Sequence, residues 1–214
     1  MQTPAIRERL VLHLLNIDKG LATAVSDALG LKAMPKPADA AVATRQDIEP
    51  SPALGIVGKG PNSFEGRKLL ITDGTDAAIL NALKKALAKE GASFEIIAPK
   101  VGGAKASDGS WILADQMIDG GPSVLYDAAL LPADDAVDEL VQESTARDFV
   151  ADAFAHCKFI GYTKSVIPLF DKTGIADSLD DGCVALSSAK DVATFVGALG
   201  QLRFWAREPN VKMQ

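Results

Sequence analysis

One short stretch of the chain has the residue pattern of a catalytic strand-to-helix turn. An apolar run over 159–162 is followed by Thr163, Lys164 and Ser165, and then by an apolar stretch that could begin a helix. Turns of this kind present a nucleophile at the end of a strand. Lys164 could act there as a desolvated amine nucleophile, or as a cation that occupies the turn electrostatically. The alternative is a structural ion pair between Lys164 and a nearby carboxylate, with Asp76 and Asp134 as the expected partners.

The other candidate nucleophiles lack a partner at the right place. Ser165 would need a histidine base, and the chain contains two histidines. His13 falls in a predicted N-terminal helix, and His156 precedes the strand whose far end carries Ser165. Cys157, beside His156, is therefore predicted to be a small buried residue, as is Cys183. These positions argue against both a serine triad and a cysteine–histidine dyad.

Two glycine-rich runs are candidates for phosphate-binding loops. They cover 57–62 and 100–110, and neither has the residue spacing of such a loop. Their glycines are more simply explained as turn residues.

The composition excludes several classes of protein. The chain has 214 residues, a net charge of -6 and 6% aromatic residues, which disfavours binding to nucleic acid. Its two cysteines form no CxxC pair, so neither a disulfide framework nor a metal site is predicted, and a reducing cytoplasm is the expected location. No run approaches the ~20 apolar residues that cross a membrane.

The first third of the chain differs in character from the rest. Residues 4–29 carry apolar side chains at spacings of three and four, which predicts an amphipathic helix or helix pair with Thr3 as N-cap and Gly30 as its end. This apolar stripe needs a partner surface. Residues 31–66 contain many prolines and show neither helical nor strand periodicity, so they are predicted to form an extended linker. The predicted domains are therefore 1–30, 31–66 and 67–214.

From residue 67 onward, strand and helix patterns alternate. Strands are predicted at 68–74, 93–99, 111–115, 126–133, 158–163 and 182–187, and helices at 76–92, 137–156, 165–174 and 189–206. This order predicts an α/β fold: a doubly wound, mostly parallel sheet with helices on both faces. Sites in such sheets lie beyond the carboxyl ends of the strands. The segments 73–76, 132–135 and 162–165 are therefore expected to line one cleft.

These segments, in this order, carry a family resemblance. The runs "GRKLLITDGTDAAILNALKKALAKEGASFEIIAP", "ASDGSWILAD", "YDAALLPA" and "FAHCKFIGYT" resemble the PfpI-like superfamily, which includes class I glutamine amidotransferase-like hydrolases and deglycases. More closely, the chain resembles the flavodoxin-like carboxy-terminal domain of large-subunit catalases. "TPAIRERLVLHLLNID" is similar to the helical segment that leads out of the catalase core, and "IVGKGPNSFEGRK" to the linker that follows it.

The resemblance implies a site that has lost its nucleophile. Active members of the superfamily carry a cysteine at the turn, followed by a histidine, and those positions correspond here to Lys164 and Ser165. Asp76 falls near the acidic residue that activates the cysteine, and Ala133 and Asp134 replace a glycine pair. A thiolate is nucleophilic near neutral pH, whereas an ordinary lysine ammonium is not. No catalytic residue, cofactor or metal ligand is therefore expected in this chain.

The implied function is accessory. The domain would stabilise, help to fold or shape a large-subunit catalase, whose reaction is hydrogen peroxide dismutation and whose haem would lie in a core that this sequence does not match. Its expected partners are that haem domain or further copies of itself, as a homo-oligomer. A stand-alone hydrolase or deglycase with an unusual nucleophile, and a chaperone-like or small-ligand binding protein, are the alternatives. Beginning within a catalase-like helical segment is the expected mark of a cut or truncated chain.

Overall fold

A computed structural model describes residues 3–45, 47–49, 51–55, 59–72, 76–131 and 137–211. The chain divides into two compact units, Met1–Leu54 and Gly55–Gln214. In the described segments, no helix combines the length and the apolar character needed to cross a bilayer.

The first unit contains a pair of helices. They are α1 (Pro4–Leu14) and α2 (Lys19–Ala28). The break between them falls at Asp18, which has an extended backbone and caps α2 with its side chain: Oδ1 accepts a hydrogen bond from Leu21 N at 2.6 Å. Gly30, with a φ of +64°, follows the end of α2. In the described residues between α2 and residue 68 there is no helix or strand.

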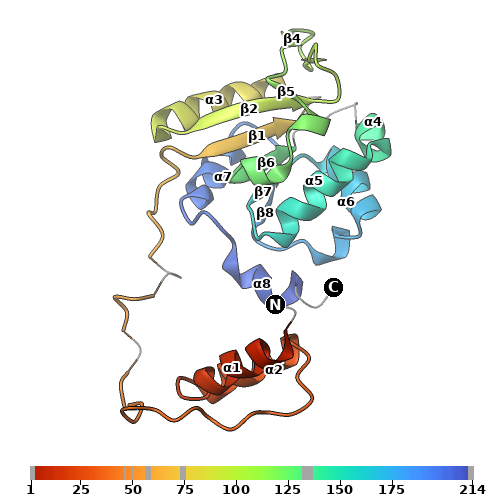
Figure 1. The fold of residues 1–214 in the computed structure, drawn as a ribbon. Coiled ribbons are helices and arrows are strands. Elements are labelled where there is room, and N and C mark those ends of the chain that lie inside the picture. Colours follow the sequence, from red (N-terminus) through yellow and green to blue (C-terminus); the bar gives the residue numbers. More distant parts are fainter. Residues whose placement is uncertain are drawn as a thin grey trace. The chain divides into compact units, whose positions relative to one another are not determined.

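The second unit is built on a six-stranded parallel sheet (Figure 1). The strand order is β5-β2-β1-β6-β7-β8, and each neighbouring pair is parallel. Parallel neighbours need a crossover connection, which here is mostly helical. The strands are β1 (Lys68–Thr72), β2 (Ser93–Ala98), β5 (Gln116–Met117), β6 (Ala128–Leu131), β7 (Ile160–Tyr162) and β8 (Cys183–Ala185).

Helices cover both faces of this sheet, as predicted. The helix α3 packs against α7 over one face, and α5 packs against α4 and α6 over the other (Figure 1). The bounds of the helices are α3 (Ala77–Glu90), α4 (Val137–Gln142), α5 (Ser144–Ala155), α6 (Ile167–Thr173), α7 (Asp191–Leu199) and α8 (Glu208–Val211). Gly91, with a φ of +72°, ends α3.

The central strands divide their side chains between two hydrophobic cores. Ala128 and Leu130 of β6 belong to the α3 and α7 core, whereas Ala129 and Leu131 belong to the α5 and α6 core. This is the alternation that a strand buried on both faces requires. Gly161 in β7 is needed because a Cβ there would lie 2.6 Å from the Leu130 side chain.

Three predicted elements are corrected by the structure. The run 111–115 is not a strand of the main sheet: β4 (Trp111–Ile112) pairs with β3 (Ala104–Lys105) in a separate antiparallel hairpin, and β5 forms the sheet edge. The predicted helix 137–156 is two helices that break at Glu143. The predicted helix 189–206 ends at Leu199, and short helical turns follow it.

Candidate functional site

The strand-to-helix turn forms where the sequence placed it. The strand β7 ends at Tyr162, and a 3₁₀ turn over Lys164–Val166 leads directly into α6. Sheet pairing continues up to this turn, because Thr163 N donates to Leu131 O at 3.0 Å. The hydroxyl oxygens of Thr163 and Ser165 lie 3.0 Å apart. The architecture of a catalytic turn is therefore present.

Within the described segments, Lys164 lacks the surroundings of an amine nucleophile. The residue is exposed, so its amine is not desolvated as a lysine nucleophile must be. Nucleophile turns are sharp and strained. Among the described non-glycine residues, positive φ angles occur only at Asn62, Cys157 and Leu202, and Lys164 is not one of them. The turn presents an exposed cation in an ordinary backbone conformation.

The carboxylate of Asp76 has a local structural role. Its Oδ1 accepts hydrogen bonds from Ala78 N at 2.8 Å and Ile79 N at 3.0 Å, which caps the start of α3. In the described segments no ion pair joins Asp76 to Lys164. Ala133, Asp134 and the segment 73–75 lie outside the described residues. The pairing of Lys164 with Asp134, and the shared cleft, therefore stay predictions.

The thiols and the second histidine do not form a reactive pair. Cys157 and Cys183 are free and buried, and burial raises both pKa values, that of Cys183 to about 11. His156 is exposed, and its Nδ1 lies 3.1 Å from Asp152 Oδ1. Cys157 and His156 precede β7, whereas Ser165 follows it. Neither thiol is therefore a thiolate at neutral pH, and neither lies at the end of β7 that carries the turn.

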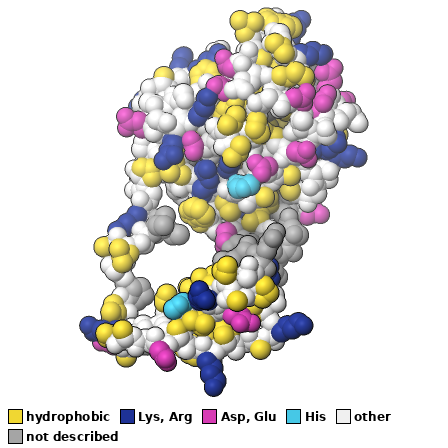
Figure 2. Space-filling model, in the orientation of Figure 1, with side chains coloured by type: hydrophobic (Ala, Val, Ile, Leu, Met, Phe, Trp, Pro, Cys, Tyr) yellow, Lys and Arg dark blue, Asp and Glu magenta, His cyan; other side chains and the backbone are white. Residues whose placement is uncertain are grey.

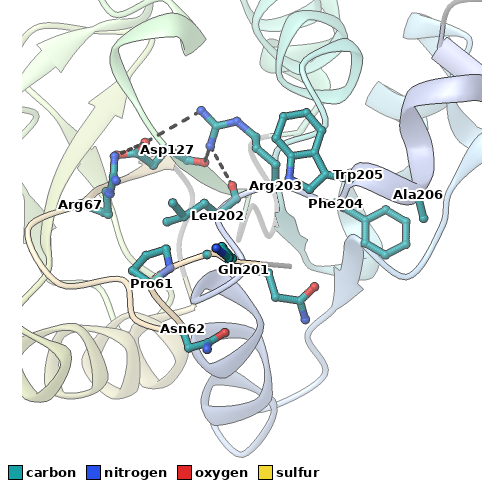
Figure 3. A pocket seen from close by; sticks show the side chains of 12 residues that line it. Pro61, Asn62, Arg67, Asp127, Gln201, Leu202, Arg203, Phe204, Trp205 and Ala206 are labelled. Atoms are coloured by element: carbon teal, nitrogen blue, oxygen red, sulfur yellow. Dashed lines mark hydrogen bonds and ion pairs between the residues drawn. The ribbon is translucent and has the colours of Figure 1, made fainter. Parts of the chain in front are cut away.

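A pocket of about 720 Å³ lies at the opposite, amino end of the sheet (Figure 3). Three chain segments that are distant in sequence form its walls: the approach to β1, the residue before β6 and the chain after α7. The lining residues are Lys59, Gly60, Pro61, Asn62, Arg67, Asp127, Gln201, Leu202, Arg203, Phe204, Trp205 and Ala206.

Strand pairing brings the first two segments together. Arg67 directly precedes β1 and Asp127 directly precedes β6, and these strands are parallel neighbours. Asp127 N donates to Lys68 O at 2.9 Å, and Lys68 N donates to Asp127 Oδ2 at 3.3 Å. The third segment is fixed by Phe204, whose N donates to Cys157 O at 2.7 Å. Backbone hydrogen bonds therefore position Asp127 beside the start of β1 and fix the chain after α7.

Asp127 lies between two guanidinium groups. Its Oδ1 is 3.7 Å from Arg67 Nη1 and 3.9 Å from Arg203 Nη2 (Figure 3). Arg203 is further held by Nη1, which donates to Asp127 O at 3.0 Å and to Leu202 O at 2.7 Å. Both carboxylate distances exceed those of a normal hydrogen bond. Asp127 therefore orients the two arginines without occupying all of their donors.

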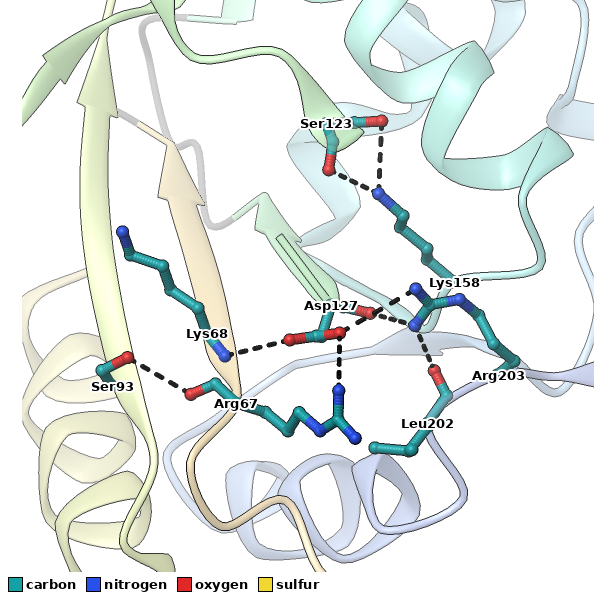
Figure 4. Close-up of polar contacts among 8 residues, drawn as sticks. All are labelled: Arg67, Lys68, Ser93, Ser123, Asp127, Lys158, Leu202 and Arg203. Atoms are coloured by element: carbon teal, nitrogen blue, oxygen red, sulfur yellow. Dashed lines mark hydrogen bonds and ion pairs between the residues drawn. The ribbon is translucent and has the colours of Figure 1, made fainter. Parts of the chain in front are cut away.

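A buried lysine lies close to this cluster (Figure 4). Lys158 is 4% exposed, and its Nζ donates to Ser123 O and, at 3.5 Å, to Ser123 Oγ. The Ser123 hydroxyl in turn donates to Asp152. Burial is the main cause that lowers the pKa of Lys158 to about 8, and the positive charge of Arg203 lowers it further. This amine is enclosed by protein and does not line the pocket.

Arg207 fixes the chain end beneath the pocket. It is 1% exposed and makes two hydrogen bonds to the Asp180 carboxylate, at 2.7 and 2.8 Å. Its Nη1 donates to Lys158 O at 2.9 Å and to Phe154 O at 3.2 Å. The guanidinium also lies 4.2 Å from the centroid of the Phe154 ring. This bidentate, stacked arrangement requires arginine rather than lysine.

Sequence patterns alone do not single out this end of the sheet. They predict sites at the carboxyl ends of the strands and one helix over 189–206. The available signal was the run Arg203–Arg207, which places two arginines and two aromatic residues within five positions after a glycine. Such a cluster is unusual for the solvent face of a helix.

Comparison with known proteins identifies relatives. Residues 68–209 match the family described as the C-terminal domain found in long catalases. The chain is 60% identical to "Catalase C" of Rhizobium meliloti over its whole length, and 34% identical to "Catalase HPII" of Pseudomonas putida over 95% of its length. These matches cover 31% and 28% of the two relatives, so the chain spans about a third of their length.

Proposed function

The chain belongs to the family of C-terminal domains found in long catalases, and on that premise we propose that it has an accessory, non-catalytic role in such a protein. The reaction of the parent protein would be hydrogen peroxide dismutation. The observation that carries the proposal is the turn after β7, where an exposed Lys164 takes the place of a nucleophile.

We propose that this chain itself binds no haem. Haem iron is held by histidine, cysteine, methionine or tyrosine. The pocket at the amino end of the sheet is lined by none of these, and neither is the pocket between α3 and the β3-β4 hairpin. In the part of the chain that the structure describes, no group of three potential metal ligands occurs. We therefore assign haem chemistry to the remainder of the long catalase.

The helix pair supplies a surface for association. Ile6, Leu10, Ile17 and Leu21 are 37% to 60% exposed, and hydrophobic side chains gather on the helical unit in Figure 2. Burying the exposed part of each side chain would contribute about 1 kcal/mol before entropy is subtracted. We propose that this face packs against the haem domain of a long catalase, and against a second copy of the chain where that domain is absent.

The strand order supports a finer assignment of the fold. Without the edge strand β5, the order β2-β1-β6-β7-β8 is the 2-1-3-4-5 order of flavodoxin-like sheets. We propose a flavodoxin-like domain on this basis. We also place the protein in the cytoplasm, because its two cysteines are free and buried.

The non-catalytic role is tested with the purified chain. After reconstitution with haem we expect no stoichiometric Soret absorbance and no oxygen evolution from hydrogen peroxide. Either signal at stoichiometric level would overturn the assignment of haem chemistry to another part of the parent protein.

The association surface is tested separately by light scattering. We expect Leu21→Asp to lower the oligomeric state, because it places a charge on the exposed apolar face. The matched control is Thr23→Asp, which adds the same charge at a neighbouring exposed position of α2. A monomeric wild-type chain, or equal effects of the two variants, would contradict the proposal.

A further inference from the structure

The accessory role leaves the pocket at the amino end of the sheet unexplained. Its lining includes three cations, Lys59, Arg67 and Arg203, and one anion, Asp127, which leaves a net charge of +2. The whole chain carries a net charge of -6. A concentration of positive charge in a hollow of an acidic protein favours anionic ligands.

The arginines retain unused hydrogen-bond donors. The Arg67 side chain is 44% exposed, and its one ion pair in the described segments is the 3.7 Å contact with Asp127. Arg203 uses Nη1 for two carbonyl groups, while its Nη2 lies 3.9 Å from Asp127. Each guanidinium has five N–H donors in a planar fork that matches phosphate or carboxylate oxygens. In Figure 3 the two side chains reach Asp127 from opposite sides.

Aromatic surface adjoins these donors. Trp205 is 48% exposed and lines the pocket together with Phe204 and Leu202. A half-exposed indole ring offers a face on which a planar group can stack, and its N–H is a further donor. In the described part of the chain, no hydrogen bond from that N–H is formed.

The backbone around the pocket is strained. Leu202 and Asn62, with φ angles of +63° and +52°, both line it. They are two of the three left-handed non-glycine residues in the described chain. Such conformations are costly for a leucine and concentrate at binding and catalytic sites.

We propose that this pocket binds a small organic dianion that carries a phosphate group on a planar ring. The phosphate would be held by Arg67, Arg203 and Lys59, and the ring would lie on Trp205. Two negative charges match the net charge of the lining. The volume of about 720 Å³ lies within the range of small-molecule sites. The binding uses side chains, so it does not need the phosphate-loop spacing that 57–62 lacks.

The chain provides its own reporter for a test. It has two tryptophans, and Trp111 lies in the other pocket, between α3 and the hairpin. In the full chain carrying Trp111→Phe, fluorescence therefore reports on Trp205 alone. Titration with phenyl phosphate should give a saturable change in fluorescence, and calorimetry of the unsubstituted chain should give the same dissociation constant. Inorganic phosphate and phenol should each bind at least about tenfold more weakly, since each lacks half of the contacts.

Two charge-removing variants locate the binding. Arg67→Gln should weaken phenyl phosphate binding about tenfold or more, because it removes a charged hydrogen-bond partner. Lys84→Gln is the matched control: it removes one positive charge at the other pocket, and should change the affinity less than twofold. Circular dichroism and thermal melts verify that both variants fold. If Arg67→Gln does not fold, Lys59→Gln replaces it as the pocket variant.

Several results would overturn the proposal. One is the absence of saturable binding by both fluorescence and calorimetry. Another is an equal loss of affinity in Arg67→Gln and Lys84→Gln, which would indicate a general charge effect. If inorganic phosphate bound as tightly as phenyl phosphate, the planar ring would contribute nothing to binding, which would contradict the proposed class of ligand. None of these outcomes depends on the haem and peroxide measurements, so the two proposals fail separately.

Discussion

The two ends of the parallel sheet treat their charged side chains differently. At the carboxyl end, Lys164 lies exposed at a turn and makes no ion pair in the segments that the structure describes. At the amino end, Arg203 and Arg207 are held by carboxylates and backbone carbonyl groups, and Lys158 is buried. In the described residues, the organised polar contacts are therefore concentrated at the amino end of the sheet.

This difference shows that an inherited turn and a working site are separable. The turn after β7 forms through local contacts: Thr163 N continues the sheet pairing with Leu131 O, and the hydroxyl groups of Thr163 and Ser165 lie 3.0 Å apart. Chemistry would need additional groups placed around Lys164. At the amino end, partner groups of this kind surround Arg203 and Arg207. Four substitutions test this contrast between the two ends of the sheet.

Arg207→Ala should have the largest effect. It would leave the partly buried Asp180 carboxylate without its partner and remove donors from the Phe154 and Lys158 carbonyl groups. Breaking a buried pair in this way costs about 3 to 5 kcal/mol of the free energy of unfolding. Urea denaturation of the variant and of the wild-type chain measures it. A loss below about 1 kcal/mol would mean that the C-terminal segment is not anchored by this residue.

Glu95→Gln should have the second largest effect and lower the free energy of unfolding by about 2 kcal/mol at pH 7. Glu95 pairs with Lys68 and accepts from Tyr126 Oη at 2.6 Å and Gln116 Nε2 at 2.8 Å. The hydrogen bond from Lys68, and next that from Tyr126, lowers the pKa of Glu95 below its ordinary value near 4.5. Hydrogen bonds to a charged group contribute about 1.5 to 3 kcal/mol.

The pH dependence of this effect has a defined sign. Because the pKa of Glu95 is lower in the folded state, its contribution is complete above about pH 4.5 and is lost as the pH falls through the folded value. The difference between wild type and Glu95→Gln should therefore shrink in acid. A difference that stays constant from pH 7 to pH 3 would contradict the ionic account.

Lys158→Met should stabilise the domain by about 1 to 2 kcal/mol at pH 7. The buried ammonium is costly, and an unbranched apolar side chain fits the same space. Its removal leaves no unsatisfied acceptor, because Ser123 O also accepts from Tyr126 N at 3.0 Å and the Ser123 hydroxyl bonds to Asp152.

In the wild-type chain, Lys158 should make the free energy of unfolding depend on pH. The pKa of Lys158 is about 8 in the folded state and 10.5 ordinarily, so the unfolded state binds more protons between these values. The contribution of Lys158 to stability should therefore rise with pH from about 8 to 10.5, and this rise should be absent in Lys158→Met. Urea unfolding curves of both proteins at pH 7, 9 and 10 measure this rise. If the free energy of unfolding depends on pH in the same way in both proteins, the pKa of Lys158 is not lowered.

Lys164→Ala should have the smallest effect and change the free energy of unfolding by at most about 0.5 kcal/mol. The side chain is exposed, and substitutions at such positions rarely change stability further. Thermal melts measure the change, with Lys172→Ala on α6 as a second surface lysine for comparison. A loss above 1 kcal/mol would show that Lys164 has a partner, with Asp134 the first candidate.

Local sequence determined much of the chain. The spacing of apolar residues predicted both N-terminal helices, and the structure resolves the alternative in favour of a pair, because Asp18 caps α2. Gly91 ended α3 as predicted, since glycine readily adopts the left-handed conformation. The turn before α6 also followed from neighbouring residues. These features depend on contacts within a few positions of the chain.

Only the tertiary structure decided the amino-end pocket and the path of the chain after α7. Residues 200–206 read as helix because their local pattern permits one. A Cβ on Gly200 would lie 2.9 Å from the Asn62 backbone, and Phe204 N bonds to Cys157 O, so segments more than 45 positions away redirect the chain. Likewise, Arg67 and Asp127 meet because β1 and β6 are neighbours in the sheet, and Arg203 reaches them because the chain after α7 is redirected. Sequence periodicity records which face of a strand is buried, but not which strand or distant segment lies beside it, and these long-range contacts assemble the pocket.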